Sequence, residues 1–121
     1  MAWEIDTDRI EAWLLSLDDP SYLQVRAALT RLVEDGPHLG RPLVDTIKAS
    51  RHKNMKELRP GSSGQSELRI LFAFNPQRKG IMLLAGDKST KWQQWYKQAI
   101  PLADDLFDEH LAQLKKGQNN G

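Results

Sequence analysis

The first part of the chain repeats apolar residues at the spacing of an amphipathic helix. Two runs have this period: Ile10, Trp13, Leu14 and Leu17 in the first, and Tyr22, Val25, Leu29 and Leu32 in the second. Asp18-Asp19-Pro20 separates the runs, and Asp35-Gly36-Pro37 ends the second, since proline and glycine interrupt helices. The pattern predicts a helical hairpin, preceded by a candidate edge strand at residues 3–5.

The period changes to two in the middle of the chain, which predicts a strand from Ser66 to Phe74. Its two faces carry Leu68, Ile70, Phe72 and Phe74 on one side and Arg69, Leu71 and Ala73 on the other. Residues 55–59 form a shorter candidate strand before the loop PGSSG. Residues 81–85 are apolar on both faces, as is typical of a central strand. We therefore expect three consecutive antiparallel strands.

A second helical pattern follows Gly86. Its apolar residues are Trp95, Tyr96, Ala99 and Ile100 before Pro101, and Leu102, Leu106, Phe107, Leu111 and Leu114 after it. We expect a break or kink at Pro101, because proline removes a helical hydrogen bond, and a disordered tail at 117–121. The whole pattern predicts one α+β domain over residues 1–116, in which an N-terminal helical hairpin packs on a small twisted antiparallel sheet, followed by C-terminal helices.

The charge distribution adds a predicted partner to this fold. The net charge is only +1, yet residues 1–47 carry nine acidic and four basic side chains. Residues 48–97 carry eleven basic and three acidic side chains, and residues 98–121 carry two basic and four acidic ones. The excess positive charge of the β-rich middle favours a polyanionic partner, although solvated surface charges cluster in the same way.

Several classes of chemistry are excluded by the sequence. It has no cysteine, and its three histidines, at 38, 52 and 110, are not spaced as metal ligands. The signatures of phosphate-binding loops, zinc proteases and serine hydrolases are missing, so we expect neither a metal nor a cofactor. No apolar run reaches the roughly 18 residues that span a bilayer, and the acidic N-terminus is unlike a secretory signal. A cytoplasmic protein is the resulting expectation.

A group of cations could supply the chemistry that cleaving RNA without a metal requires. Such a reaction must stabilise the negative charge that grows at phosphorus, and it must move protons. Arg69, Lys56 and Lys88, on or beside adjacent predicted strands, are candidates for these roles. Each also has a structural explanation. Arg69 could pair with Glu57 or Glu67, Lys56 could protect a sheet edge, and Lys88 could be a turn residue.

Further residues of this region could contact RNA directly. The ring of Tyr96 could stack a base, or it could belong to the core. Five residues of the basic stretch are predicted RNA-binding residues: Arg51, His52, Lys53, Arg59 and Lys91. His52 lies between two cations and could act as an acid or base, although an exposed loop histidine is the simpler interpretation.

Three segments of the chain read MKELRP, SELRILFAFNPQRKGIMLLAGDKS and WYKQAIPLADDLFDEHL. The first two resemble the strand core of RelE/ParE-superfamily toxins, nearest to the HigB-like and phage-derived branch, and the third resembles the C-terminal helix of one subgroup. The similarity covers about residues 40–97, and the predicted helical hairpin agrees with it. The resemblance implies a RelE-like fold and the toxin of a type II toxin–antitoxin system. Such a toxin is a metal-independent, ribosome-dependent endoribonuclease that cuts messenger RNA in the ribosomal A site and inhibits translation.

By position, the resemblance assigns the catalytic roles to Lys56, Arg69, Lys88 and Tyr96. The family element GF-x-KK is GDKS here, and the superfamily also contains gyrase inhibitors. A ParE-like gyrase inhibitor and a non-catalytic nucleic-acid-binding remnant therefore stay open as alternatives. The implied partners are a cognate antitoxin with a helix-turn-helix domain, bound over the basic face, and the ribosome with its messenger RNA. No membrane is implied.

Overall fold

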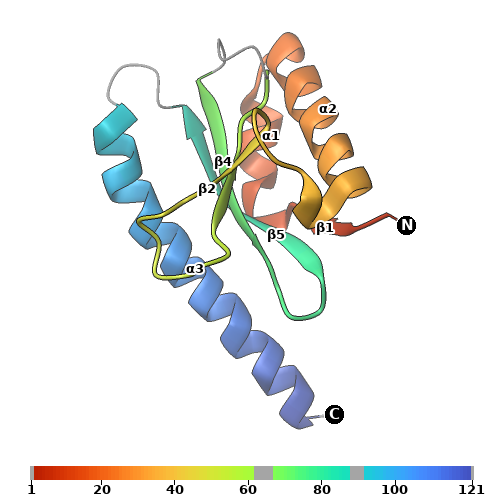
Figure 1. Ribbon diagram of the computed structural model, residues 1–121, viewed down its shortest axis with the longest axis vertical. Helices are drawn as coiled ribbons and strands as arrows, with labels where there is room; N and C mark the ends of the chain where they lie inside the picture. The colour runs from red at the N-terminus through yellow and green to blue at the C-terminus, as the bar shows by residue number, and fades with distance from the viewer. Residues whose placement is uncertain (1, 62–66, 88–91, 121) are drawn as a thin grey trace.

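The computed structural model describes residues 2–61, 67–87 and 92–120, without the side chains of Trp92 and residues 118–120. Along the chain the elements are β1 (Glu4–Asp6), the 3-10 turn η1 (Asp8–Ile10), α1 (Glu11–Ser16), α2 (Asp19–Asp35), the 3-10 turn η2 (Gly36–His38), β2 (Val44–Thr46), β3 (Lys56–Leu58), β4 (Leu68–Phe74), β5 (Lys79–Asp87) and α3 (Trp92–Asn120) (Figure 1). The α+β class and the order of elements agree with the prediction.

The strands form one five-stranded sheet in the order β1-β5-β4-β3-β2. The predicted antiparallel run of β3, β4 and β5 is confirmed, with Lys56 opposite Phe72 and Ala73 opposite Ile81. The sheet is mixed rather than wholly antiparallel, because β1 pairs with β5 in parallel. The sequence did not predict β2, whose three residues are too few to show a period.

Helices cover both faces of this sheet (Figure 1). The helical hairpin α1–α2 packs on the face that carries Leu58, Ile70, Phe72 and Met82. Helix α3 packs on the face that carries Leu71, Ala73, Ile81 and Leu83. The alternation predicted for β4 is thus confirmed, and both of its faces are buried. The face that carries Arg69 lies beneath α3.

Helix α3 passes through Pro101 without ending. Of the break or kink expected at this proline, the break into two helices is therefore wrong. Pro101 is exposed, while Ala99, Ala103 and Phe107 on the opposite side are buried in one cluster. Packing along this continuous apolar face outweighs the hydrogen bond that the proline removes. The helix also extends to Asn120, into the segment 117–121 for which the sequence predicted no order.

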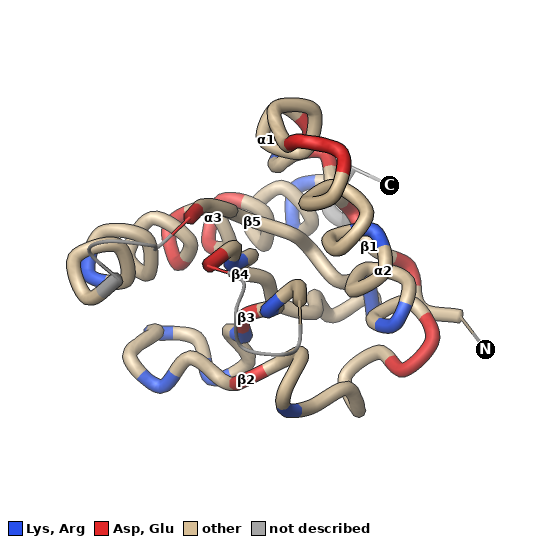
Figure 2. Tube along the Cα trace, turned by 90° about the horizontal axis from the view of Figure 1, so that it is seen from above, with Lys and Arg blue, Asp and Glu red and all other residues tan. Residues whose placement is uncertain are grey.

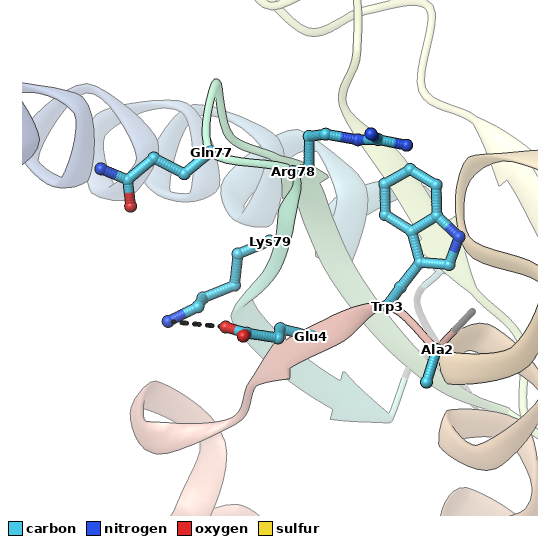
Figure 3. Close-up of a pocket in the computed structure, with 6 residues that line it drawn as sticks. All are labelled: Ala2, Trp3, Glu4, Gln77, Arg78 and Lys79. Carbon is cyan, nitrogen blue, oxygen red and sulfur yellow. Dashed lines mark ion pairs between the residues drawn. The ribbon is translucent and has the colours of Figure 1, made fainter.

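Trp3, the residue before β1, adds contacts at the β1 edge of the sheet to the pairing of β1 with β5. Its backbone N–H donates to the Val33 carbonyl at 2.8 Å, and its ring meets Phe74 edge-on with centroids 5.6 Å apart. The guanidinium of Arg78 lies 4.6 Å from the centroid of the ring, and Lys79 pairs with Glu4 of β1 at 3.4 Å. Figure 3 shows Trp3, Glu4, Arg78 and Lys79 among the side chains that line a hollow, whose volume is about 480 Å³. The contacts join β1 to the β4–β5 hairpin.

Local chemistry decides where α2 begins and ends. The carboxylate of Asp18 accepts a hydrogen bond from the Ser21 N–H at 2.8 Å, which caps the first turn. Gly36 ends the helix with a φ of 58°, a left-handed conformation that other residues adopt at a cost. A Cβ at this position would lie 2.3 Å from Nε1 of Trp3. Gly36 is therefore required both by the backbone and by the ring packed against it.

Substituting Gly36→Ala should lower the free energy of unfolding by about 1–2 kcal/mol, because of the left-handed backbone alone. Displacement of Trp3 would add to this loss. Gly40→Ala is the matched control, since a Cβ there meets nothing within 4 Å. Urea titration of both variants measures the difference, and equal midpoints would contradict this account of the α2 terminus.

His110 connects α3 to the β4–β5 hairpin. It is 8% exposed, and its Nε2 lies 3.0 Å from Nδ2 of Asn75. Oδ1 of Asn75 accepts from the backbone N–H groups of Gln77 and Lys79 at 2.9 and 3.0 Å. Burial, and next the positive charge of Arg9, lower the pKa of His110 from its ordinary value of 6.5. His110 therefore serves to connect α3 to the hairpin.

A lowered pKa of His110 gives a pH dependence with a defined sign. As the pH falls below 6.5, the unfolded chain takes up a proton at this residue more readily than the folded chain does, so stability is lost as the pH falls. We expect the midpoint of thermal unfolding to decrease from pH 7 toward pH 5, and His110→Gln to flatten the decrease. The exposed His38 supplies the control His38→Gln, which should leave the slope as it is. A wild-type slope in His110→Gln would refute the assignment.

Candidate nucleic-acid interface

A buried carboxylate organises the polar groups between the sheet and α3. Glu57 of β3 is 2% exposed. Its Oε1 accepts a hydrogen bond from Nε of Arg59 at 2.8 Å, and its Oε2 accepts one from the Tyr96 hydroxyl at 2.6 Å. Strand alternation explains this placement, because Leu58 turns to the α1–α2 face and Glu57 to the α3 face. Asp45 of β2 also pairs with Arg59, at 3.6 Å.

Arg69 of β4 lies on the same face of the sheet. Glu57 is opposite Leu71 in the β3–β4 register, and Arg69 precedes Leu71 by two positions, so the two charged residues are diagonal neighbours. Arg69 is 6% exposed, and its Nη1 donates to the carbonyl of Leu68 at 2.7 Å. We call Glu57, Arg59, Arg69 and Tyr96 the polar cluster.

The electrostatics of the polar cluster keep Tyr96 neutral. Burial, and next the hydrogen bond to Glu57, raise the pKa of Tyr96 to about 12, against the opposing effect of Arg69. Burial disfavours the charged form of Arg59, but the carboxylates of Glu57 and Asp45 outweigh it and raise the pKa of Arg59. At neutral pH the phenol of Tyr96 therefore keeps its proton and donates a hydrogen bond to Glu57, and Arg59 is charged.

The structure brings together only some of the predicted catalytic residues. Arg69 and Tyr96 meet in the polar cluster. Lys56 lies on the opposite face of the sheet with Leu58, and its Nζ donates to the Pro37 carbonyl at 3.3 Å. The predicted residues Lys88 and Lys91 lie outside the described part of the chain.

The predicted RNA-binding residues Arg51 and His52 already contact acidic residues of α3. Arg51 pairs with Asp105 at 3.2 Å and also with Asp108. The Nε2 of His52 lies 2.8 Å from Asp108. Lys53 is exposed in the same loop. Seen from above, basic positions cluster in the loop beside β2 and β3, and acidic positions occur along α3 (Figure 2).

Buried Asp104 of α3 fixes this loop in place. It is 2% exposed, and it accepts hydrogen bonds from the Ser50 hydroxyl and, at 3.0 Å, from the Arg51 N–H. Ile47 and Met55, at the two ends of the loop, are buried in the cluster beneath α3. The pattern of the sequence did not reveal Asp104, because an acid within an amphipathic helix is ordinarily exposed.

A hollow of about 430 Å³ separates the loop from the first half of α3. Its lining comprises Ala49, Arg51, Gln93, Tyr96, Lys97, Ile100, Pro101 and Asp104. The ring of Tyr96 connects this hollow to the polar cluster. Glu57 was missed as an organising residue, although its place in a strand next to buried Leu58 was a usable signal.

In the part of the chain that the structure covers, no helix combines the length and apolarity needed to cross a bilayer.

Comparison with known proteins identifies the family. The model of the family "Phage derived protein Gp49-like (DUF891)" matches residues 12–108. Two Mycobacterium tuberculosis proteins named as toxins are similar in sequence. HigB2 is 58% identical over 115 residues, which are 95% of this chain and 57% of HigB2. HigB3 is 43% identical over 104 residues, which are 86% of this chain and 89% of HigB3. The chain thus spans little more than half the length of HigB2.

The fold has a counterpart among solved structures. A mutant of the E. coli toxin RelE in the free state superposes with a TM-score of 0.57 at 16% identity, over 84% of this chain and 97% of RelE. At this identity the likeness concerns the fold. With the family match and the similarity to HigB2 and HigB3, it shows that the chain belongs to the phage-derived Gp49-like family as a HigB-like member with the RelE fold.

Proposed function

We propose that this chain is a cytoplasmic toxin of a type II toxin–antitoxin pair and an endoribonuclease that cleaves messenger RNA on the ribosome without a metal ion. The observation that carries the proposal is the polar cluster, which gathers two arginines, a tyrosine and a carboxylate on one sheet face of a HigB-like chain. Guanidinium groups are suited to the phosphorane, because they offer charged donors in a fixed plane.

The proposed roles follow from the position of each side chain. Arg69 and Arg59 stabilise the charge that grows on the phosphate oxygens. Tyr96 positions the nucleotide beside them, and Glu57 holds Arg59 and Tyr96 in place through its two oxygens. Because Lys56 lies on the opposite face, we assign it no contact with the reacting phosphate.

Other cations belong to the proposed RNA path. Lys53 is exposed in the loop held by α3, and Lys88 and Lys91 belong to the same basic stretch of the sequence. For Arg51 and His52, RNA phosphates would compete with the acidic residues of α3 that these side chains already contact. The proposed second partner is an antitoxin with a helix-turn-helix domain that covers the basic face when the two are coexpressed.

Induction of the protein followed by mapping of messenger RNA 5′ ends tests the proposed activity. We expect growth to stop and new 5′ ends to appear within translated codons. DNA breaks and filamentation with intact messages would instead indicate a gyrase inhibitor. Steeply salt-dependent RNA binding without cleavage would indicate a non-catalytic remnant. The burial of Arg69 favours the non-catalytic remnant, unless the residues that cover Arg69 move.

A further inference from the structure

The arginine proposed to stabilise the phosphorane is covered in this structure. Arg69 is 6% exposed and Glu57 is 2% exposed, so a phosphate in solution cannot reach them. The cover is the first part of α3. The Tyr96 hydroxyl is hydrogen-bonded to Glu57. Trp95 packs closely on β5, because a Cβ added at Gly86 would lie 2.6 Å from Nε1 of Trp95. RNA can contact Arg69 only after this part of α3 moves.

The two parts of α3 are held to the molecule in different ways. After Pro101, the buried side chains of Ala103 and Phe107 join the core. Asp104 accepts two hydrogen bonds from the loop beside β3, and His110 contacts Asn75. These contacts anchor the second part. Segments with fewer buried contacts open at lower cost than the rest of a protein.

The first part of α3, residues 92–100, has less buried surface. Four of its residues are exposed: Gln93, Gln94, Lys97 and Gln98. Among the residues of this segment whose side chains the structure describes, Ala99 is the buried apolar one, at 4% exposed. The Tyr96 hydroxyl of this segment donates a hydrogen bond to Glu57 at 2.6 Å. The hydrogen bond that holds this segment to the sheet is thus made by two members of the polar cluster, Tyr96 and Glu57.

Pro101 lies where these two parts meet. Proline has no N–H, so the carbonyl of Lys97 receives no helical hydrogen bond from position 101, and the pyrrolidine ring crowds that carbonyl. Helices bend at such positions. The hollow of about 430 Å³ lies beside the proline and is lined on both sides of it, by Tyr96 and Lys97 before and Asp104 after. The first part of α3 thus has both a weakened backbone connection and adjacent space.

From this arrangement we infer that residues 92–100 are a hinged cover over Arg69, which turns at Pro101 and opens to admit an RNA phosphate to the polar cluster. The identity of the ligand rests on the proposed function. The opening itself rests on the geometry of α3 and can be measured without RNA.

Hydrogen exchange of the full chain, with Pro101→Ala as the variant, tests the hinge. In the wild type, amides of 93–100 should exchange faster than those of 103–114. Alanine restores the missing N–H, so Pro101→Ala should slow exchange in 93–100 by about tenfold or more and raise the midpoint of thermal unfolding. Leu102→Ala is the control, because Leu102 is 54% exposed in the same turn and its replacement changes no backbone bond. Uniform exchange along α3 in the wild type would overturn the hinge.

RNA measurements test what the cover admits. A short 2′-O-methyl oligoribonucleotide, which cannot be cleaved, should accelerate exchange in 93–100 of the wild type. Pro101→Ala should cleave messenger RNA about tenfold more slowly than Leu102→Ala while being the more stable protein. If Pro101→Ala slowed hydrogen exchange in 93–100 and still cleaved messenger RNA at the wild-type rate, residues 92–100 would not be a cover that must open before cleavage. If the wild type cleaves no RNA, the proposed function fails, and the RNA part of this inference fails with it, whereas exchange without RNA still decides whether the segment opens.

Discussion

Arg69→Ala is expected to prevent growth arrest and to lower messenger RNA cleavage in translating extracts by about 100- to 1,000-fold. This is the usual loss when one donor to a developing oxyanion is removed. Arg69 is the buried cation of β4, beside Tyr96 and diagonal to Glu57, and a neutral side chain there would leave Arg59 alone to meet the phosphate. Quantified 5′ ends under single-turnover conditions give the rate.

Two further variants separate chemistry from folding. Arg69→Lys keeps a charge but loses the planar fork of donors, so its cleavage rate should fall between wild type and Arg69→Ala. Arg31→Ala removes an arginine of α2 whose side chain is 55% exposed and paired with Asp35, and it should cleave normally. Thermal unfolding of each variant shows whether it is folded. Full cleavage by a folded Arg69→Ala protein would exclude Arg69 from the reaction.

Asp104→Ala should lower the free energy of unfolding by about 3 kcal/mol. The carboxylate accepts hydrogen bonds from the Ser50 hydroxyl and the Arg51 N–H, and each bond to a charged acceptor contributes about 1.5 kcal/mol or more. The substitution also releases the basic loop from α3, so RNA binding should weaken together with stability. Urea unfolding monitored by circular dichroism measures the stability change.

The neighbouring residue provides the matched control. Asp105 also pairs with Arg51, at 3.2 Å, but its side chain is 72% exposed, against 3% for Asp104. Exposed ion pairs are screened by water and contribute little, so Asp105→Ala should unfold close to the wild type. Similar losses in both variants would show that the charge of this helix, and not the buried contact, stabilises the loop.

The strand β4 shows which structural features a periodic pattern can predict. Its alternation predicted which residues share a face, and the structure confirms that Arg69 lies with Leu71 and Ala73, opposite Phe72. The structure also places Arg69 next to Tyr96. The alternation of β4 was predictable because it depends on local periodicity over a segment long enough to show it.

Lys56 shows where the same reasoning stops. Its own strand placed it on the face of Leu58, but only the register with β4, in which Lys56 is opposite Phe72, decides that this face is the one away from Arg69. A shift of one residue would have reversed the result. Asp104 and Pro101 were unpredictable for a related reason, because a helix interior tolerates a buried acid or a proline only when the tertiary contacts compensate.

By itself, then, the sequence determined the α+β class, the two faces of the central strand and the concentration of positive charge in the middle of the chain. The tertiary structure alone decided that α3 covers Arg69, that Glu57 joins Arg59 to Tyr96, and that Asp104 holds the basic loop. The physical reason is distance along the chain. Periodicity fixes the direction of neighbouring side chains, whereas contacts between residues far apart in the sequence depend on strand register and packing. Glu57 and Tyr96 are 39 positions apart, and Arg51 and Asp104 are 53 positions apart.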